Sequence, residues 1–366
     1  MTGGPLTIVI AGGGTGGHLY PGLAVARALM ARVPDAQVSF AGTSRGLEAR
    51  VVPEAGFELD VIRSRGLKGK SIANRLRGAA LLPAGLLDAW RLLSRRRPHV
   101  VVGVGGYSSG PVVLLASLRG MATMVLEQNA VPGLTNRWLA PFVRAAAVNY
   151  ERTLEHFGGK GFVSGNPVRA EFVGAGSDAA RAPHPPQVLI VGGSQGAHAI
   201  NVAMTAAAPE LMRQCPGVEI VHQTGARDRE WVQAQYDAAG IGARVVAFLD
   251  AMADKMTAAD VVVSRAGATT LAELAALGRP AIFIPLPTAT DDHQRKNAQV
   301  LVDLGAAKLV DERVLNQPEG PVTLAGTIAG LVGDEAGRAA MSTAMRAAAR
   351  PGAADAIVSR ILELAA

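Results

Sequence analysis

The sequence predicts an α/β protein with two tandem domains, each a doubly wound parallel sheet. Runs rich in Val, Ile and Leu alternate with Ala- and Leu-rich helical stretches throughout the chain. Each half opens with a strand, a glycine-rich turn and a helix. The 366 residues exceed what one hydrophobic core usually serves, and the 49% hydrophobic content excludes a disordered chain.

The expected strands are nearly continuous apolar runs, as strands covered on both faces are. They are residues 6–11, 37–42, 99–105 and 122–128 in the first half, and 187–193, 218–225, 243–248, 260–264 and 280–287 in the second. The Gly-, Pro- and Ser-containing stretch 165–187 has the composition of a linker. We therefore expect domains at 1–165 and 166–344, with a final helix, 345–366, packing back on the first.

Glycine-rich turns follow three of these strands, at residues 12–18, 192–198 and 103–111. Such a turn before a helix exposes backbone N–H groups that bind anions. Three such loops therefore indicate a ligand that carries several phosphates. The alternative is that the glycines only permit tight turns. The first loop also fits the G-x-G-x-x-G dinucleotide pattern, but 40–44 (FAGTS) replaces the expected acidic strand end, and Glu48 comes later. This disfavours an NAD-dependent oxidoreductase.

Charge and cysteine content further limit the expected partners and cellular compartment of the protein. The first 165 residues carry 19 Lys and Arg against 9 Asp and Glu, so the first half is the one expected to meet an anionic surface. The single cysteine, Cys215, excludes a disulfide framework and suits a reducing compartment. No D-x-D pair is present, and the cluster at 291–293 (DDH) fits a solvated helix start better than a metal site.

A set of motifs gives the chain a specific resemblance. The motifs are GGTGGHLYPGLAVA (13–26), GLKGK (66–70), GVGGYSSGP (103–111), EQNAVPGLTNRWL (127–139), GNPVR (165–169), GGSQGA (192–197), HQTG (222–225), SRAGATTLAE (264–273) and DDHQRKNA (291–298). In this order they resemble the bacterial UDP-N-acetylglucosamine–N-acetylmuramyl-(pentapeptide) pyrophosphoryl-undecaprenol N-acetylglucosamine transferases, the MurG family.

The resemblance implies a glycosyltransferase fold of the GT-B type, two Rossmann-like domains with the active site in the cleft between them. It implies inverting transfer of N-acetylglucosamine from UDP-N-acetylglucosamine to the C4 hydroxyl of lipid I, forming lipid II at the cytoplasmic face of the plasma membrane. No metal or other cofactor is expected, because helix dipoles and arginines would stabilise the leaving diphosphate. Other cell-wall synthesis proteins are further candidate partners, and nucleic acid is not.

The resemblance implies roles for individual residues of the matched motifs. The donor set is Thr15, Gly16, Gly17, Asn129, Arg169, Ser194, Leu249, Ala268, Thr269, Thr270, Leu271, Ala272, Glu273 and Gln294. Asn129 and Gln294 are expected on the sugar, Arg169 and Ser194 near the diphosphate or nucleotide, and Leu249 beside the uracil. Glu273 is expected on the ribose, since a carboxylate accepts two hydrogen bonds from a cis-diol; a solvated helix glutamate is the alternative. Arg265 is a further candidate contact for the diphosphate.

The acceptor-side loops are expected to comprise Gly14, Gly105, Gly106, Tyr107 and Ser108. His18 ends the first glycine loop and is the candidate general base, since inversion requires the attacking hydroxyl to lose a proton. The alternative is that His18 donates to an acceptor phosphate or packs at the helix start. His198, its counterpart in the second loop, is expected to be structural or near the nucleotide. Where family members often have histidine before the EQN triplet, this chain has Leu126.

A basic segment predicts contact with anionic lipid. Residues 63–97 hold ten Lys and Arg against Asp88, interleaved with leucines and Trp90. The alternative is that these leucines belong to the core and the arginines to a solvated face. Two other functions stay open, a glycosyltransferase with another lipid acceptor, such as diacylglycerol, and a non-catalytic UDP-sugar-binding module.

Overall fold

The computed structural model describes residues 4–64, 82–174, 184–193 and 196–366. The chain divides into two compact units, the first comprising Met1–Arg169 with Arg350–Ala366 and the second Ala170–Ala349. The chain therefore leaves the first unit after Arg169 and returns at Arg350, where we expected boundaries at 165 and 345.

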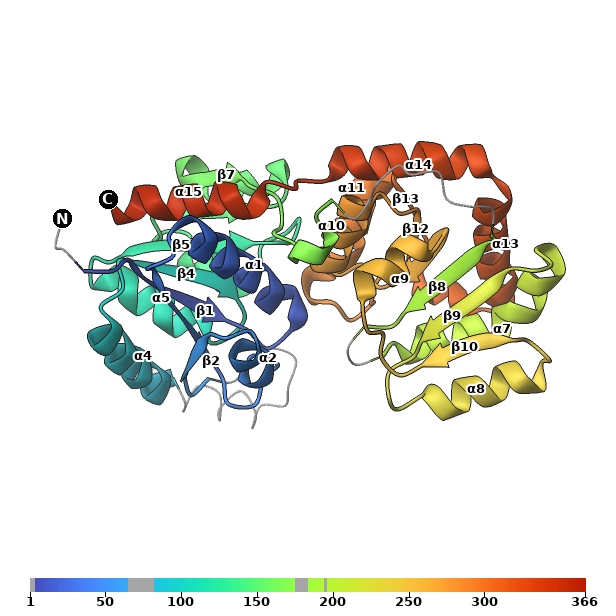
Figure 1. Cartoon of the computed structure of the whole chain (residues 1–366), viewed down its shortest axis with the longest axis horizontal. Coiled ribbons are helices and arrows are strands. Elements are labelled where there is room, and N and C mark those ends of the chain that lie inside the picture. Colours follow the sequence, from blue (N-terminus) through green and yellow to red (C-terminus); the bar gives the residue numbers. More distant parts are fainter. Residues whose placement is uncertain (1–3, 65–81, 175–183, 194–195) are drawn as a thin grey trace. The chain divides into compact units, whose positions relative to one another are not determined.

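The first unit is built on a seven-stranded parallel sheet in the order β3-β2-β1-β4-β5-β6-β7 (Figure 1). Its strands are β1 (Thr7–Gly12), β2 (Gln37–Gly42), β3 (Glu58–Val61), β4 (Val100–Gly105), β5 (Ala122–Glu127), β6 (Ala145–Val148) and β7 (Gly161–Val163). The order of the first six is that of the Rossmann fold. This confirms the predicted fold class for the first half.

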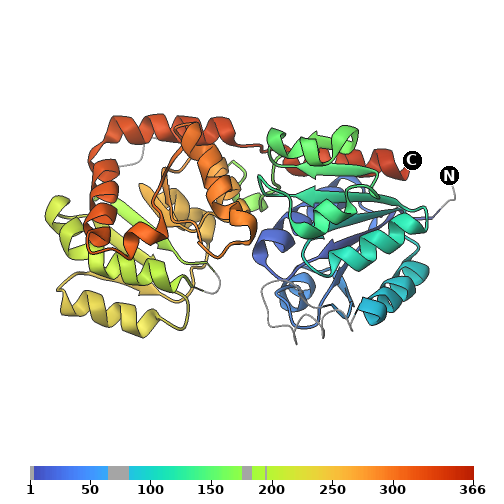
Figure 2. The ribbon, with the colours of Figure 1, turned by 180° about the vertical axis from the view of Figure 1, so that it is seen from behind.

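Helices cover both faces of this sheet, as the continuous apolar strands require. In β1, Ile8 and Ile10 face the core beneath α1, α2 and α15, whereas Val9 and Ala11 face the core beneath α4, α5 and α6. Figure 2 shows α4 and α5 in front of the sheet. The helices are α1 (Gly16–Arg32), α2 (Glu48–Glu54), α4 (Leu82–Arg96), α5 (Ser109–Leu118), α6 (Leu134–Leu139) and α15 (Ala353–Ala365), with 3₁₀ turns η1 (Glu151–His156) and η2 (Gly158–Lys160).

The last helix, α15, belongs to the first unit. It lies beside α1 and buries Ile357, Val358 and Ile361 in the same core as the α1 leucines (Figure 1). Arg32 at the end of α1 donates to the Ser359 hydroxyl at 2.7 Å. The N-terminal and C-terminal segments of the chain therefore stabilise one sheet together.

The second unit repeats the plan with a six-stranded parallel sheet, ordered β10-β9-β8-β11-β12-β13. Its strands are β8 (Gln187–Val191), β9 (Glu219–Gln223), β10 (Ala243–Val246), β11 (Val261–Ser264), β12 (Ala281–Phe283) and β13 (Ala307–Leu309). This is again the Rossmann order, with the first strand of the unit between its second and fourth. The prediction of two Rossmann-like domains is confirmed.

The helices of the second unit also form two layers. The α7, α8 and α13 helices share one core with the sheet, and α9, α10 and α11 lie on the other side, where α14 packs against α10 (Figures 1 and 2). These helices are α7 (His198–Gln214), α8 (Arg229–Ala238), α9 (Met252–Ala258), α10 (Ala268–Leu277), α11 (His293–Asp303), α12 (Glu312–Leu315), α13 (Gly320–Gly333) and α14 (Glu335–Ala348), with 3₁₀ turns η3 (Ala170–Phe172) and η4 (Thr290–Asp292).

The three glycine-rich turns lie at carboxyl ends of strands. In each unit the first strand, β1 or β8, sits between strands whose connections run to opposite sides, which is where ligands bind in open parallel sheets. The folds thus bring the glycine-rich loops to the functional edge of each sheet. Within the described ranges, no helix combines the length and apolar character needed to cross a membrane.

Candidate functional site

The first glycine loop connects β1 to α1 and carries His18 in the first helical turn. Thr15 precedes the helix, and its carbonyl accepts the backbone N–H groups of His18 and Leu19 at 3.2 and 3.1 Å. The Thr15 hydroxyl lies 3.3 Å from Nδ1 of the half-buried His18 ring. The tautomer with Nδ1–H donating to this hydroxyl places the lone pair on Nε2, which is the arrangement a general base needs.

The third glycine loop packs directly against the first. The Gly13 N–H donates to the Gly105 carbonyl at 3.4 Å. A Cβ on Gly105 would lie 2.7 Å from the His18 ring, and the φ of Gly105 is +96°, so glycine is required for this close approach. The structure thus brings together Gly14, Thr15, His18, Gly105 and Gly106. Tyr107 is half exposed and Ser108 is buried. Gly16 and Gly17 form the first turn of α1.

Asn129 is held by a buried carboxylate. Glu127, the last residue of β5, accepts hydrogen bonds from the Asn129 backbone and side chain at 3.0 and 3.1 Å. Its other oxygen accepts from the Gly133 N–H and the Asn136 amide, both at 2.9 Å. Burial raises the pKa of Glu127, and these four donors oppose that rise. Sequence reasoning assigned no role to Glu127 or Asn136, although both lie in the matched motif at residues 127–139.

In the first unit, Leu126 is a core residue and Arg169 contacts α1. The Leu126 side chain is 2% exposed and belongs to the core beneath α1, so an apolar residue suits this place in β5. The Arg169 guanidinium lies 4.9 Å from the centre of the Tyr20 ring, a cation–π contact with α1. Its predicted role at the diphosphate or nucleotide stays a prediction.

In the second unit, the Gln223 side chain holds the start of the second glycine loop by hydrogen bonds. Its Oε1 accepts the Gly193 N–H at 3.0 Å, and its Nε2 donates to the carbonyls of Gly193 and Ala247 at 3.1 and 2.8 Å. These hydrogen bonds connect the carboxyl ends of β8, β9 and β10. Gln223 lies in the HQTG motif, and sequence reasoning gave it no role. Ser194, a predicted donor residue of this loop, lies outside the described residues.

The 268–273 segment forms the first two turns of α10, where we expected a loop and a helix start. Gly267 precedes the helix, and its carbonyl accepts the Leu271 N–H at 3.0 Å. Ala268, Thr269, Leu271 and Glu273 are buried, and Thr270 and Ala272 are half-buried. Glu273 is only 5% exposed, which argues against a solvated surface glutamate. Leu249 is half-buried in the segment after β10.

Arg265 does not fit the suggested diphosphate contact. Its Nη1 lies 2.5 Å from a Glu312 carboxylate oxygen and donates to the Ile284 carbonyl at 3.1 Å. The ion pair and the carbonyl hold the guanidinium across to the β12 and β13 ends, so we drop Arg265 from the candidate site.

Gln294 lies in the first turn of α11, and its side-chain orientation is fixed. Its Oε1 accepts the Leu286 N–H at 3.0 Å, which leaves Nε2 as the side chain's donor group for a sugar hydroxyl or carbonyl. Just before α11, Asp291 and Asp292 both adopt positive φ, and Asp292 pairs with Arg295 at 3.5 Å. Among the described residues, no group of three or more His, Cys, Asp or Glu is arranged to hold a metal ion.

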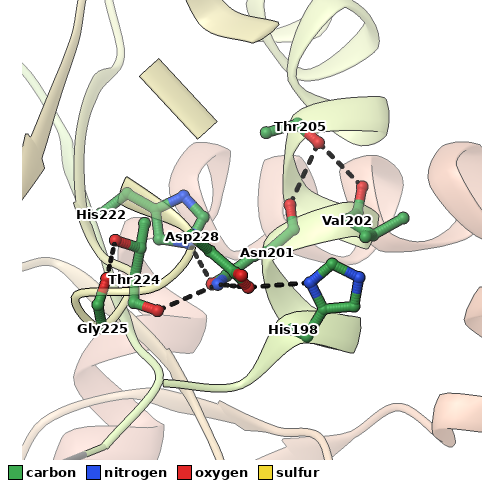
Figure 3. Close-up of polar contacts among 8 residues, drawn as sticks. All are labelled: His198, Asn201, Val202, Thr205, His222, Thr224, Gly225 and Asp228. Carbon is green, nitrogen blue, oxygen red and sulfur yellow. Dashed lines mark hydrogen bonds and ion pairs between the residues drawn. The ribbon is translucent and has the colours of Figure 1, made fainter. Parts of the chain in front are cut away.

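His198 belongs to a polar network between α7, β9 and the start of α8 (Figure 3). Its Nδ1 lies 2.8 Å from an Asp228 oxygen, which also accepts the Asn201 amide at 2.8 Å. The Asn201 Oδ1 in turn faces Nε2 of the fully buried His222 at 3.0 Å. Because that oxygen only accepts, Nε2 of His222 carries the hydrogen, and Nδ1 accepts from the Tyr236 hydroxyl at 2.9 Å.

This network predicts a measurable pH dependence of stability. Burial lowers the pKa of His222 to about 3. Below about pH 6.5, therefore, His222 binds a proton in the unfolded chain but stays neutral in the folded chain. Stability from this site is therefore present above pH 6.5 and is lost as the pH falls. Between pH 7 and 5, urea unfolding should show the wild type losing about 2 kcal/mol more than His222→Gln. The exposed-site control His156→Gln should keep the wild-type pH dependence; equal pH dependence in all three proteins would contradict the assignment.

Comparison with known proteins identifies the family. Family models for the glycosyltransferase family 28 N-terminal and C-terminal domains match residues 8–148 and 187–357. The UDP-N-acetylglucosamine–N-acetylmuramyl-(pentapeptide) pyrophosphoryl-undecaprenol N-acetylglucosamine transferase of Anaeromyxobacter sp. (strain K) is 49% identical over 311 residues, which cover 85% of this chain and 81% of that protein. The chain belongs to the MurG family.

Other members of the MurG family support the same placement. The protein of the same name from Pelobacter propionicus is 46% identical over 333 residues, covering 85% of this chain and 88% of that protein. The crystal structure of Acinetobacter baumannii MurG superposes with a TM-score of 0.79 at 30% identity, covering 98% of this chain and all of that chain. The chain is therefore a glycosyltransferase with the MurG-family fold.

Proposed function

We propose that this chain transfers N-acetylglucosamine from UDP-N-acetylglucosamine to the C4 hydroxyl of the N-acetylmuramyl residue of lipid I, with inversion, and so forms lipid II. The observation that carries the proposal is the 49% identity over 311 residues to a relative named for this transfer. The second unit binds the UDP portion of the donor and the first unit binds the acceptor. In the first unit, Asn129 stays a predicted contact of the sugar portion, and Thr15, Gly16 and Gly17 stay predicted donor residues.

The donor is held at the carboxyl edge of the second sheet. Glu273 accepts hydrogen bonds from the ribose hydroxyls, and the Gln294 Nε2 donates to the sugar. The N-terminus of α10 carries a partial positive charge that stabilises the UDP leaving group as negative charge builds on it. In other glycosyltransferases a divalent metal stabilises this charge. Here the N-terminus of α10 takes that role, and the reaction proceeds without a metal.

In the first unit, His18 accepts the proton of the attacking hydroxyl. The hydrogen bond to Thr15 and the packing against Gly105 fix the ring plane, so Nε2 is presented in one orientation. An imidazole with a free lone pair can accept a proton, which is what a general base must do.

A test of the reaction and of the metal-free mechanism is the release of UDP, measured with a short-chain lipid I analogue in the presence of EDTA. We expect acceptor-dependent UDP release at the same rate with EDTA as with magnesium. Release that needs magnesium would keep the transfer and contradict the metal-free mechanism. Binding of UDP-N-acetylglucosamine without release would favour the non-catalytic binding module.

The lipid-linked acceptor requires contact with a membrane, and the first unit has a suitable surface. Large apolar side chains on and after α4, α5 and α6 are exposed, namely Leu86, Leu87, Trp90, Leu118, Leu134, Trp138 and Phe142. Arg119 stacks on Trp90 at 4.5 Å. We propose that these residues, here called the apolar surface, dock on anionic lipid at the cytoplasmic face of the plasma membrane.

The structure revises the sequence-based description of this surface. Leu92 and Leu93 are core residues, and Arg63, Arg95 and Arg96 pair with acidic residues. The alternative that leucines are core and arginines solvated therefore holds for part of α4. The predicted Arg65, Lys68, Lys70, Arg75, Leu76, Arg77 and Leu81 lie outside the described residues, whereas α5 and α6 contribute apolar residues that the sequence pattern did not indicate.

Liposome flotation tests the apolar surface. Trp138 is 71% exposed, so Trp138→Ser should lower binding to anionic vesicles by about tenfold, the order expected for withdrawing one aromatic side chain from the interface. Trp231→Ser, in the second unit, is the matched control and should bind as the wild type does. Turnover of a short-chain, water-soluble acceptor should be unchanged in both. Binding that is indifferent to Trp138 or to anionic lipid content would contradict the proposed surface.

A further inference from the structure

A buried carboxylate lies beneath the first glycine loop. Glu48, the first residue of α2, is 1% exposed. Its Oε2 accepts the Gly14 N–H at 2.7 Å. Its Oε1 accepts the Thr43 N–H at 2.9 Å and the Thr43 hydroxyl at 2.8 Å. Three donors from two loops therefore converge on one side chain.

The contacts favour the ionised form of Glu48. Burial alone would raise the pKa of the carboxyl, but the hydrogen bonds from Gly14 and Thr43 outweigh it and hold the pKa below the usual value. The backbone N–H groups of Gly14 and Thr43 can only donate, so each needs an oxygen that accepts. An anion satisfies both.

Neighbouring glycines leave room for this anion. A Cβ on Gly13 would lie 2.6 Å from the Glu48 carboxyl carbon, and one on Gly46 would lie 2.1 Å from its Oε2. Both positions therefore require glycine for the carboxylate to reach the loop. In a nucleotide-binding domain of this topology, the N–H groups of the first glycine loop face a phosphate of the ligand.

We propose that Glu48 is a positioning residue for the transfer reaction: its carboxylate takes the place of a bound phosphate in the first glycine loop and holds the loop, and through it His18, in one geometry. The inference rests on the proposed function for its catalytic consequence. It also explains why a loop with the glycines of a dinucleotide site belongs to the acceptor-side unit, because the Gly14 N–H is already used by an internal anion.

The path from Glu48 to His18 is short. Gly14 is followed by Thr15, whose carbonyl accepts the His18 N–H and whose hydroxyl contacts the His18 ring. Gly13, which lies against the Glu48 carboxylate, donates its N–H to the Gly105 carbonyl, and the His18 ring packs against Gly105. Release of Gly14 therefore loosens both of the contacts that orient the imidazole.

The first test measures the loop itself, independently of activity. Glu48→Gln has the same shape but replaces one acceptor oxygen with a donor group, which opposes an N–H of Gly14 or Thr43. Glu54→Gln, an exposed position on the same helix, is the matched control. By hydrogen exchange and mass spectrometry, the peptide covering residues 11–19 should exchange at least tenfold faster in Glu48→Gln and at the wild-type rate in Glu54→Gln.

An unchanged rate in folded Glu48→Gln overturns the proposal, whether or not the protein transfers N-acetylglucosamine. If Glu48→Gln does not fold, Thr43→Val, which removes one donor and spares the carboxylate, takes its place. That variant should speed exchange of the same peptide about threefold, and unchanged exchange again overturns the proposal.

The second test asks whether the loop acts through His18. Glu48→Gln should lower kcat about tenfold or more while the Kd for UDP stays within twofold of wild type, because the UDP portion of the donor binds the other unit. The double variant Glu48→Gln/His18→Ala should be no slower than His18→Ala alone, as expected for residues acting through one path. The positioning role would be overturned if the kcat losses of the two single variants multiplied in the double variant. It would also be overturned if the Kd for UDP rose as kcat fell in Glu48→Gln. A wild type with no transfer would instead overturn the proposed function and leave the exchange result to decide on the loop.

Discussion

His18→Ala should lower kcat for transfer at least about a hundredfold, because the attacking hydroxyl loses the group that accepts its proton. The affinity for UDP should stay nearly unchanged, since the imidazole belongs to the first unit, where it contacts Thr15 and packs against Gly105. Steady-state kinetics with a short-chain lipid I analogue measure the first quantity, and calorimetry with UDP measures the second.

The matched control for this experiment is His156→Ala, a histidine of the same unit at a partly exposed surface position. It should transfer at the wild-type rate. A near-normal rate for His18→Ala would remove His18 as the base and favour its alternative role as a phosphate donor or packing residue.

Glu273→Ala should weaken binding of UDP by roughly 1.5–3 kcal/mol, a factor of about 10 to 150, because a carboxylate that accepts from both ribose hydroxyls is lost. Glu273 is buried in the second turn of α10, so its side chain is ordered before the ligand arrives. Calorimetry with UDP and with its 2′-deoxy analogue measures the effect and its origin.

The 2′-deoxy comparison separates recognition from damage. Wild type should bind the deoxy analogue more weakly than UDP, and Glu273→Ala should bind the two alike, because the discriminating acceptor is gone. Glu230→Ala, at an exposed position in the first turn of α8, should retain the wild-type preference. If Glu273→Ala still prefers UDP over its deoxy analogue to the wild-type extent, the carboxylate does not contact the ribose.

Much of the fold was predictable because parallel strands covered on both faces leave a strong pattern. Val and Ile runs such as residues 6–11 and 187–191 mark the central strands, and the glycine-rich turns that follow them mark the two sheet centres. The return of α15 to the first unit was also predictable in outline, since an Ala-rich helix with Ile357, Val358 and Ile361 on one side needs an apolar surface to cover.

The contacts that shape the site were not predictable, because they join residues distant in sequence. Glu48 was noted only as an acid that comes too late for a dinucleotide site, and nothing local shows that its side chain turns back to Gly14. The ion pair of Arg265 with Glu312 spans 47 residues and removes a cation that local sequence places at the helix start. In α4, Leu87 and Leu92 are alike in sequence, yet one is exposed and the other is core.

Analysis of the product decides whether the chain joins N-acetylglucosamine to lipid I. We would incubate the full chain with UDP-N-acetylglucosamine and a short-chain lipid I analogue, and examine the purified product by mass spectrometry and proton NMR. We expect a mass gain of one N-acetylhexosamine and the large anomeric coupling of a β-linked sugar. An unchanged acceptor mass, or an α-linked product, would contradict the proposed function.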